Sequence, residues 1–308
     1  MKLTLALYIL LLSFQAVSGQ GTVNKADSLK EQGLLMPALM EYAQLMSQNP
    51  SSELSYKIAS TSALLWTSAM RDTSIIYLNI ALQNDSTLKA LHDPDFLSLI
   101  DNPGWNKIED GQIRKFEEKN GSIKNEPYAR ELFRMIIKDQ GLMYAGNIER
   151  RKYMRNGGYF NTPAIFPVLA MEEKNRVENE KKLLQLFDKY GWPVASEVTE
   201  IAAAGAALII NHSSYELRSQ YFPMLEKAFK EGEAQPLRYA KMRDRLLVEE
   251  GKAQMFGTQL KYVNSARVPH PIIEPEYVDK RRAEIGLGPL NVYLKERFNI
   301  DWSYIANE

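Results

Sequence analysis

The sequence predicts a mainly α protein, with paired helices first and then a compact helical domain that carries a small extended or hairpin element. Apolar residues recur at helical spacing through residues 24–110 and again from Pro127 onward. The three prolines of the stretch PHPIIEP (269–275) favour an extended run instead, because the residue before a proline avoids helical geometry. We therefore expect the extended element after Gln259.

The first helical segment, residues 24–110, has small residues where two helices would approach, an aromatic residue between them and a proline after the second helix. These positions are Ala26, Gly33, Ala38, Tyr42 and Pro50. A weaker copy follows, in which Tyr77 and Asp85 correspond to the tyrosine and the proline. The pattern resembles the tetratricopeptide repeat, whose helix pairs stack on one another. An unrelated pair of helical hairpins is the alternative.

The end of this segment and the start of the next differ in composition. The stretch ALHDPDFLSLIDNPGWNKI (90–108) resembles the short helical tail often seen after such repeats, where DPDF starts a helix and the tryptophan packs behind it. Residues 111–126 are polar, charged and contain glycine, which is typical of a linker. The sequence therefore predicts a second domain over residues 127–308.

Two helices of the second domain are predicted to be buried. SEVTEIAAAGAALIINH (196–212) is small and apolar nearly all round, which favours a central helix capped by Ser196. The helix from Pro236 to Gly251 is apolar on two sides, and Asp244 lies in the middle of one of them. A buried carboxylate needs a partner, because leaving its charge unpaired costs several kcal/mol.

The N-terminus, residues 1–19, is typical of a secretory signal peptide. Lys2 gives a positive start, Leu3–Leu12 is an almost unbroken apolar run, and small residues precede a cleavage site that would leave Gln20 first. A membrane anchor is the alternative, but spanning a bilayer takes about 20 apolar residues. We therefore expect an exported protein, periplasmic or secreted, with no membrane association after cleavage.

The composition excludes several classes of function. Lys+Arg and Asp+Glu both total 38, so there is no basic excess to indicate a nucleic-acid partner. The absence of cysteine excludes thiolate metal centres and cysteine nucleophiles. The histidines, His92, His212 and His270, are far apart, and one of them with scattered carboxylates such as Asp139 and Asp244 makes a poor metal site. We expect no metal and no cofactor.

Five short motifs follow one another in the second domain. They are Asp139-Gln140, GWP at 191–193, Asn211-His212, DRLLVEEGKAQMFGTQ at 244–259 and VDKRRAEIGLGPLNVYL at 278–294. In this order they resemble the bacterial domain-of-unknown-function family 6624, over residues 127–295. The resemblance implies a set of motif positions and no chemistry. These positions are Asp139, Gln140, Trp192, His212, Asp244, Arg245, Gln254, Gly257, Thr258, Gln259, Asp279, Arg282, Gly286 and Leu287.

The chain departs from the family pattern in three places. Gly141 and the residues after it stand where the family tends to have an arginine, Asn211 replaces a glutamine, and Ser214 replaces an acidic residue. These changes put in doubt any role that needs a charge beside His212.

His212 and Asp244 are the candidate catalytic residues. A carboxylate bonded to one ring nitrogen orients the imidazole, whose other nitrogen can then move a proton. The alternatives are a purely structural pair, no contact between the two, or an ion pair of Asp244 with Arg282. The candidate binding residues are Asp139, Gln140, Arg245, Gln254, Thr258, Gln259 and Arg282.

Two functions of different classes follow from these residues. The first is an exported binding or interaction module, in which the N-terminal helical segment binds a protein or peptide and the second domain carries a polar site around His212, Asp244 and the 254–259 loop. The second is a hydrolase with His212 as general base and Asp244 as its orienter. Gln254 and Gln259 would then donate amide hydrogen bonds to the reacting carbonyl.

Overall fold

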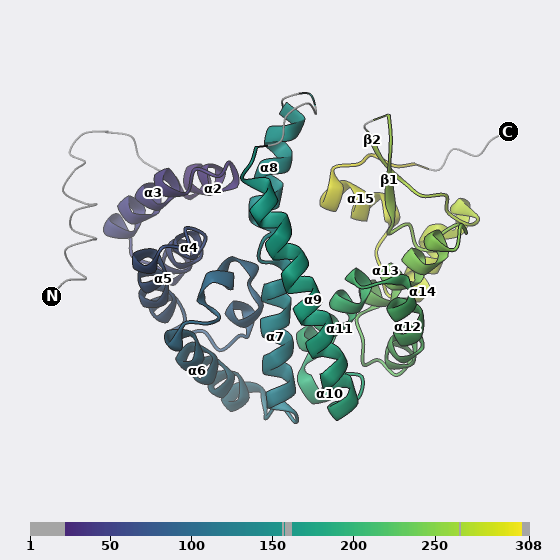
Figure 1. Ribbon diagram of the computed structural model, residues 1–308, viewed down its shortest axis with the longest axis horizontal. Helices are drawn as coiled ribbons and strands as arrows, with labels where there is room; N and C mark the ends of the chain where they lie inside the picture. The colour runs from purple at the N-terminus through teal and green to yellow at the C-terminus, as the bar shows by residue number, and fades with distance from the viewer. Residues whose placement is uncertain (1–21, 156, 158–161, 265, 304–308) are drawn as a thin grey trace. The chain divides into compact units, whose positions relative to one another are not determined.

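The protein has two compact units, both mainly helical, so the predicted fold class is confirmed (Figure 1). The computed structural model describes residues 22–155, 157, 162–264 and 266–303. The first unit comprises the chain up to Ser122 together with Ile137–Glu173, and the second comprises Ile123–Ile136 and the chain from Lys174 onward. The predicted signal peptide, residues 1–19, lies outside the described residues.

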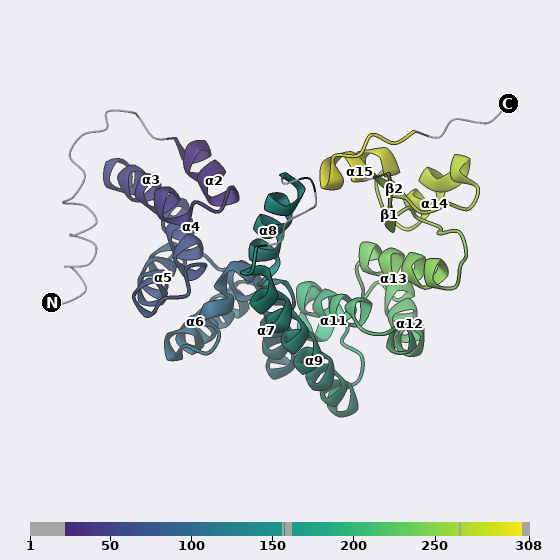
Figure 2. The same ribbon diagram turned by 45° about the horizontal axis from the view of Figure 1, so that its top comes forward.

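The first unit begins as a succession of helices, which Figure 2 shows from a second side. Its elements are α2 (Val23–Glu31), α3 (Leu35–Gln48), α4 (Ser52–Ala63), α5 (Ser68–Ala81), the 3-10 helices η1 (Lys89–His92) and η2 (Pro94–Leu99), α6 (Pro103–Asn120) and α8 (Met143–Arg155). Ala26, Ala38 and Tyr42 are fully buried in one apolar cluster, as the repeat spacing requires. The helix pair is therefore present, whereas its membership of the repeat family stays a prediction.

The helical tail after the pairs forms as predicted, and part of the predicted linker after it is helical. Asp93 caps η2 by accepting the Asp95 N–H at 3.0 Å, and the buried Trp105 ring packs 5.8 Å from Phe96. Helix α6 then continues through Asn120, into the predicted linker 111–126. Gln112 gives the reason, because this polar residue is 1% exposed and donates to the backbone carbonyls of Asp85 and Thr87, which lie between α5 and η1.

The second unit combines helices with one hairpin. Helices α7 (Glu126–Gln140) and α9 (Ile165–Tyr190) have residues in both units. The other elements of the second unit are α10 (Ala195–Val198), α11 (Glu200–His212), α12 (Tyr215–Lys230), α13 (Pro236–Glu249), β1 (Leu260–Val263), β2 (Ala266–Pro269), η3 (Pro275–Tyr277), α14 (Val278–Glu284) and α15 (Leu290–Phe298). Strands β1 and β2 are antiparallel with Leu260 opposite Pro269, which confirms an extended element after Gln259.

The apolar stretch 196–212 forms two helices instead of the single one predicted. Thr199 lies between them with a φ of 88°, and its hydroxyl accepts the Ala202 N–H at 3.4 Å, so Thr199 rather than Ser196 caps α11. The middle of α11, Ala202–Ile210, is buried, as predicted, whereas Ile201 is 37% exposed. A Cβ atom at Gly205 would lie 2.6 Å from the Ile136 side chain, so the glycine allows α7 to approach α11 closely.

Two glycines inside helices give opposite stability predictions. Gly205→Ala should lower the free energy of unfolding by about 1–2 kcal/mol, because overpacking against Ile136 exceeds the gain in helix propensity. Gly111→Ala, in α6, is the matched control: a Cβ there meets nothing within 4 Å, so stability should rise by about 0.5–1 kcal/mol. Urea unfolding followed by circular dichroism measures both. Equal shifts of the same sign would contradict the packing argument.

Candidate functional site

Asp244, in α13, is fully buried and holds the loop that follows this helix. Its Oδ1 accepts the N–H groups of Met255 and Phe256 at 2.7 and 3.0 Å. Its Oδ2 accepts the N–H and the hydroxyl of Thr258, both at 2.9 Å. These four donors use the acceptor positions of an ionised carboxylate. The buried charge therefore finds its partners in the loop itself.

The surroundings of Asp244 favour a structural role for this residue. Burial raises the pKa of Asp244 above its ordinary value, and the N–H groups of Thr258, Phe256 and Met255 act against that rise. His212 is the last residue of α11 and is half-buried. Because the loop supplies the donors described above, catalysis by His212 with Asp244 stays a prediction without support from this geometry.

Gln254 and Gln259 are internal ties of the same loop. Gln254 is fully buried, and its side-chain oxygen accepts the Gln259 N–H at 2.8 Å. Its amide nitrogen donates to the backbone carbonyls of Gln259 and His270, at 3.0 and 2.9 Å. The Gln259 side chain donates to the backbone carbonyl of Lys241 at 3.2 Å. Both amides thus donate to backbone carbonyls of the protein. We had predicted that they would donate to a substrate.

Arg282 supports this loop from the other side. Its guanidinium is buried, donates to the carbonyls of Phe256 and Gly288 at 2.7 Å each, and lies 5.0 Å from the centre of the Tyr293 ring. Phe256 therefore binds Asp244 through its N–H and Arg282 through its carbonyl. An ion pair of Asp244 with Arg282 was one of the alternatives. In the structure the backbone of Phe256 links the two residues.

Gly257 allows the loop to turn beneath the carboxylate. Its φ is 75°, and a Cβ atom there would lie 2.6 Å from the side chain of Leu290. The N–H of Leu290 in turn binds the Asp279 carboxylate at 2.8 Å at the start of α15. The implied motif positions Gly257 and Asp279 therefore have structural reasons to be glycine and an acid.

The remaining predicted binding residues lie elsewhere. Arg245 is 3.5 Å from Glu249, one turn further along α13. Asp139 and Gln140 end α7, where the Gln140 amide donates to the Asp139 carboxylate. These two belong to the first unit, whereas His212 and Asp244 belong to the second.

A polar cavity of about 390 Å³ lies in the first unit, among residues of α2, α4 and α8. It is lined by Asp27, Lys30, Glu31, Lys57, Tyr144, Asn147 and Arg151. None of these residues could be predicted from the sequence as part of a site, because charged positions on amphipathic helices have the same pattern as an ordinary solvated face. The three that lie on α2, Asp27, Lys30 and Glu31, carry charges of both signs.

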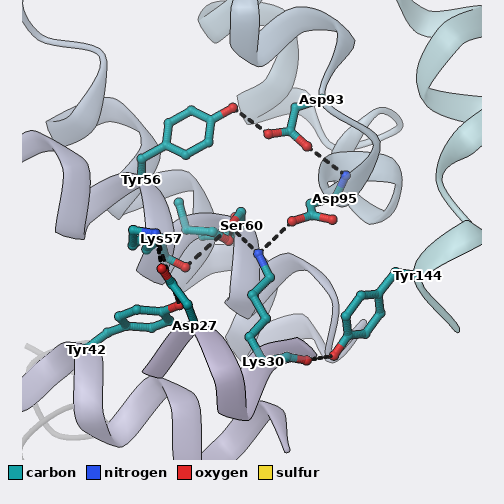
Figure 3. Close-up of polar contacts among 11 residues, drawn as sticks. Asp27, Lys30, Tyr42, Tyr56, Lys57, Ser60, Asp93, Asp95 and Tyr144 are labelled. Carbon is teal, nitrogen blue, oxygen red and sulfur yellow. Dashed lines mark hydrogen bonds and ion pairs between the residues drawn. The ribbon is translucent and has the colours of Figure 1, made fainter. Parts of the chain in front are cut away.

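Two lysines of this cavity are held by carboxylates (Figure 3). Lys57 Nζ lies 2.8 Å from the Asp27 carboxylate. Lys30 Nζ donates to the Ser60 hydroxyl at 2.8 Å and to Asp95 at 2.7 Å. Burial raises the pKa of Asp95, although the Lys30 ammonium opposes that rise. These pairs fix the lysines at the wall of the cavity.

Helix α8 closes the cavity against the end of α2. The Tyr144 hydroxyl donates to the backbone carbonyl of Lys30 at 2.6 Å, and Arg151 donates to that of Glu31. Burial, with the negative charge of Asp95, raises the pKa of Tyr144 to about 12. The tyrosine therefore stays a neutral donor, and α8 donates hydrogen bonds to two carbonyl groups at the end of α2.

These observations define a mainly helical protein of two units, with a polar cavity in the first and a loop held by a buried carboxylate in the second. Residues 131–301 match DUF6624, a family of unknown function, and the chain belongs to this family. No curated protein and no solved structure matches the chain. Across the described ranges, no helix has the length and apolar character to cross a membrane.

Removing the Asp244 carboxylate should release the 254–259 loop. Asp244→Ala leaves buried N–H groups of Met255, Phe256 and Thr258 without an acceptor, so we expect a loss of about 3–5 kcal/mol in the free energy of unfolding. Asp301→Ala is the control: Asp301 is 86% exposed in its pair with Lys295, and an exposed pair contributes about 0–1 kcal/mol. Urea unfolding measures both variants, and equal losses would contradict the structural role.

Proposed function

We propose that the protein is an exported binding protein whose first unit holds a short peptide segment in the cavity among α2, α4 and α8. One observation carries the proposal: the cavity has exposed charges of both signs at its edge, and its lysines are already paired with carboxylates of the protein. Arg151 and Glu31 are exposed at its edge, and Lys57 is paired with Asp27 within it. A peptide segment has the matching chemistry, because its termini and side chains carry both charges.

The arrangement of the cavity supports a small polar ligand. Its volume of about 390 Å³ falls within the usual range of ligand sites, about 300–1,000 Å³. The Arg151 guanidinium has further N–H donors beside the one bound to Glu31, and a planar guanidinium suits a carboxylate. Glu31, which is exposed at the edge, would attract an ammonium group, whereas Asp27 is already paired with Lys57. Arrays of paired helices commonly bind peptides in this manner.

The 254–259 loop is a weaker candidate for the ligand site. Asp244 and Gln254 are fully buried, and both use their side-chain groups on the backbone of the loop. A ligand would have to break these bonds before it could form its own. For the same reason we propose binding in preference to hydrolysis by His212.

Export is the second part of this proposal, and the charged start and apolar run of residues 1–19 support it. Expression of the full chain in a bacterium should give an extracytoplasmic protein whose first residue is Gln20. Fractionation and N-terminal sequencing test this directly. Replacing Leu10 and Leu11 with arginine interrupts the apolar run and should keep the chain inside the cell at its full length. Export of that variant would contradict a signal peptide.

The peptide site is tested by retention of random-sequence hexapeptides on the mature protein, with mass spectrometry to identify them and calorimetry on the best. Arg151→Gln should weaken binding about tenfold, equivalent to about 1.4 kcal/mol, because one charge-assisted contact is lost. Arg114→Gln, an exposed arginine of α6 paired with Glu118, is the matched control and should bind as the parent does. No retained peptide, or equal affinity of the two variants, would contradict the proposal.

A further inference from the structure

We propose a second binding site, for a phosphate monoester group, at a cluster of cations in the second unit. The cluster consists of Lys241 on α13, Arg267 on β2 and Arg297 on α15, with Arg238 beside Lys241. This site is independent of the peptide cavity, which belongs to the first unit. It also differs from the sites predicted from the sequence, none of which includes these residues.

One phenylalanine gathers two of the arginines. Helix α15 lies beside the β1–β2 hairpin, as both ribbon views show. The guanidinium carbons of Arg267 and Arg297 lie 4.8 and 5.9 Å from the centre of the Phe298 ring. A cation on an aromatic face keeps its N–H donors at the ring edge available. Both arginines are exposed, so a ligand can reach those donors from solvent.

Lys241 adds a third cation, and it is the least solvated of the three. It is half-buried on α13, one turn after Arg238 on the same face. The charges that act on it, Arg297 and Arg238, are both positive. Burial, followed by these two cations, lowers the pKa of Lys241 to about 8. An anion bound here would offset the repulsion among these cations. The ligand would supply the negative charge that the cluster needs.

The three cations have no acid in an ion pair with them among the residues that the structure describes. Within the ranges that the structure describes, Lys241, Arg267 and Arg297 take part in no ion pair, whereas neighbouring Lys295 pairs with Asp301 at 2.8 Å. Three positive charges suit a dianion better than a single carboxylate, because each charge is then matched more closely. Guanidinium groups bind phosphate oxygens in a bidentate manner. A phosphate monoester, doubly charged near pH 8, therefore fits the cluster best.

The test uses the full mature chain and inorganic phosphate as the probe, at constant ionic strength set with chloride. A limiting amine-reactive reagent labels the lysines at pH 8, and peptide mass spectrometry follows each one. Because its pKa is about 8, Lys241 should gain reactivity as pH rises through 8, well below the pH at which an ordinary lysine with a pKa near 10.5 does so. Phosphate should slow labelling at Lys241 in a saturable manner and leave Lys295 unaffected.

Variants locate the bound phosphate. Arg297→Gln, which changes an exposed residue, and Lys241→Met, which keeps the aliphatic stem, should each weaken phosphate binding about tenfold in calorimetry. Lys295→Gln changes a cation on the same helix that is already paired, and it should bind within about twofold of the parent. Protection by chloride as strong as that by phosphate, or equal affinity of all three variants, would overturn the proposal.

The source of the phosphate group is a separate arm of the experiment. Vesicles of phosphatidylcholine with and without phosphatidic acid are sedimented with the protein. Binding of inorganic phosphate together with retention on phosphatidic acid assigns the site to a lipid headgroup, and binding of phosphate without retention assigns it to a soluble ligand. Retention on vesicles without any phosphate binding would overturn the site.

Discussion

The second unit depends on one buried negative charge. Asp244 lies at the centre of a helix that is packed on more than one side, where an unpaired carboxylate would be strongly unfavourable. The chain satisfies it by turning back on itself at Gly251 and presenting three N–H groups and a hydroxyl. The course of the loop is therefore set by an electrostatic requirement of the preceding helix.

Further contacts extend this constraint toward the C-terminus. Arg282 of α14 takes the carbonyl of Phe256, and Leu290 of α15 packs against Gly257, so both helices are positioned against the loop that Asp244 holds. Gln254 then aligns the loop with the chain after β2. Each of these links joins a motif residue to a backbone group. A sequence pattern of this kind can persist for the sake of the fold alone, without a reaction to explain it.

Much of this architecture could be predicted from the sequence. Periodicity indicated the helix that ends before Gly251, and prolines indicated the extended run near Pro269, because both are local effects. Helix α6 extends into the predicted linker because Gln112 is buried by hydrogen bonds to carbonyls 25 and 27 residues earlier, which polarity cannot reveal. The predicted Ser196 cap is wrong because the chain turns at Thr199 with a φ of 88°, and a positive φ at a threonine leaves no mark in the composition.

For the candidate sites too, local features could be predicted from the sequence, whereas contacts between distant parts of the chain could not. Asp244 could be recognised as a carboxylate in need of partners, and the 254–259 loop was predicted to lie near it. The sequence did not show that the backbone N–H groups of this loop would be the donors. The cavity of the first unit was missed entirely, because Tyr144 and Arg151 meet α2 across more than 110 positions of chain. The cationic cluster was missed because Lys241, Arg267 and Arg297 come from three elements, α13, β2 and α15, that are separated in the sequence.

The division of the cavity between two parts of the chain bears on its role. Tyr144 and Arg151 fall within the matched family range, whereas Asp27, Lys30 and Lys57 precede it. One wall thus belongs to the family domain and the opposite wall to the helices before it. Under the proposed peptide binding, the exposed guanidinium of Arg151 would meet the carboxylate of the ligand from the α8 side, and Glu31 would meet its ammonium group from the α2 side.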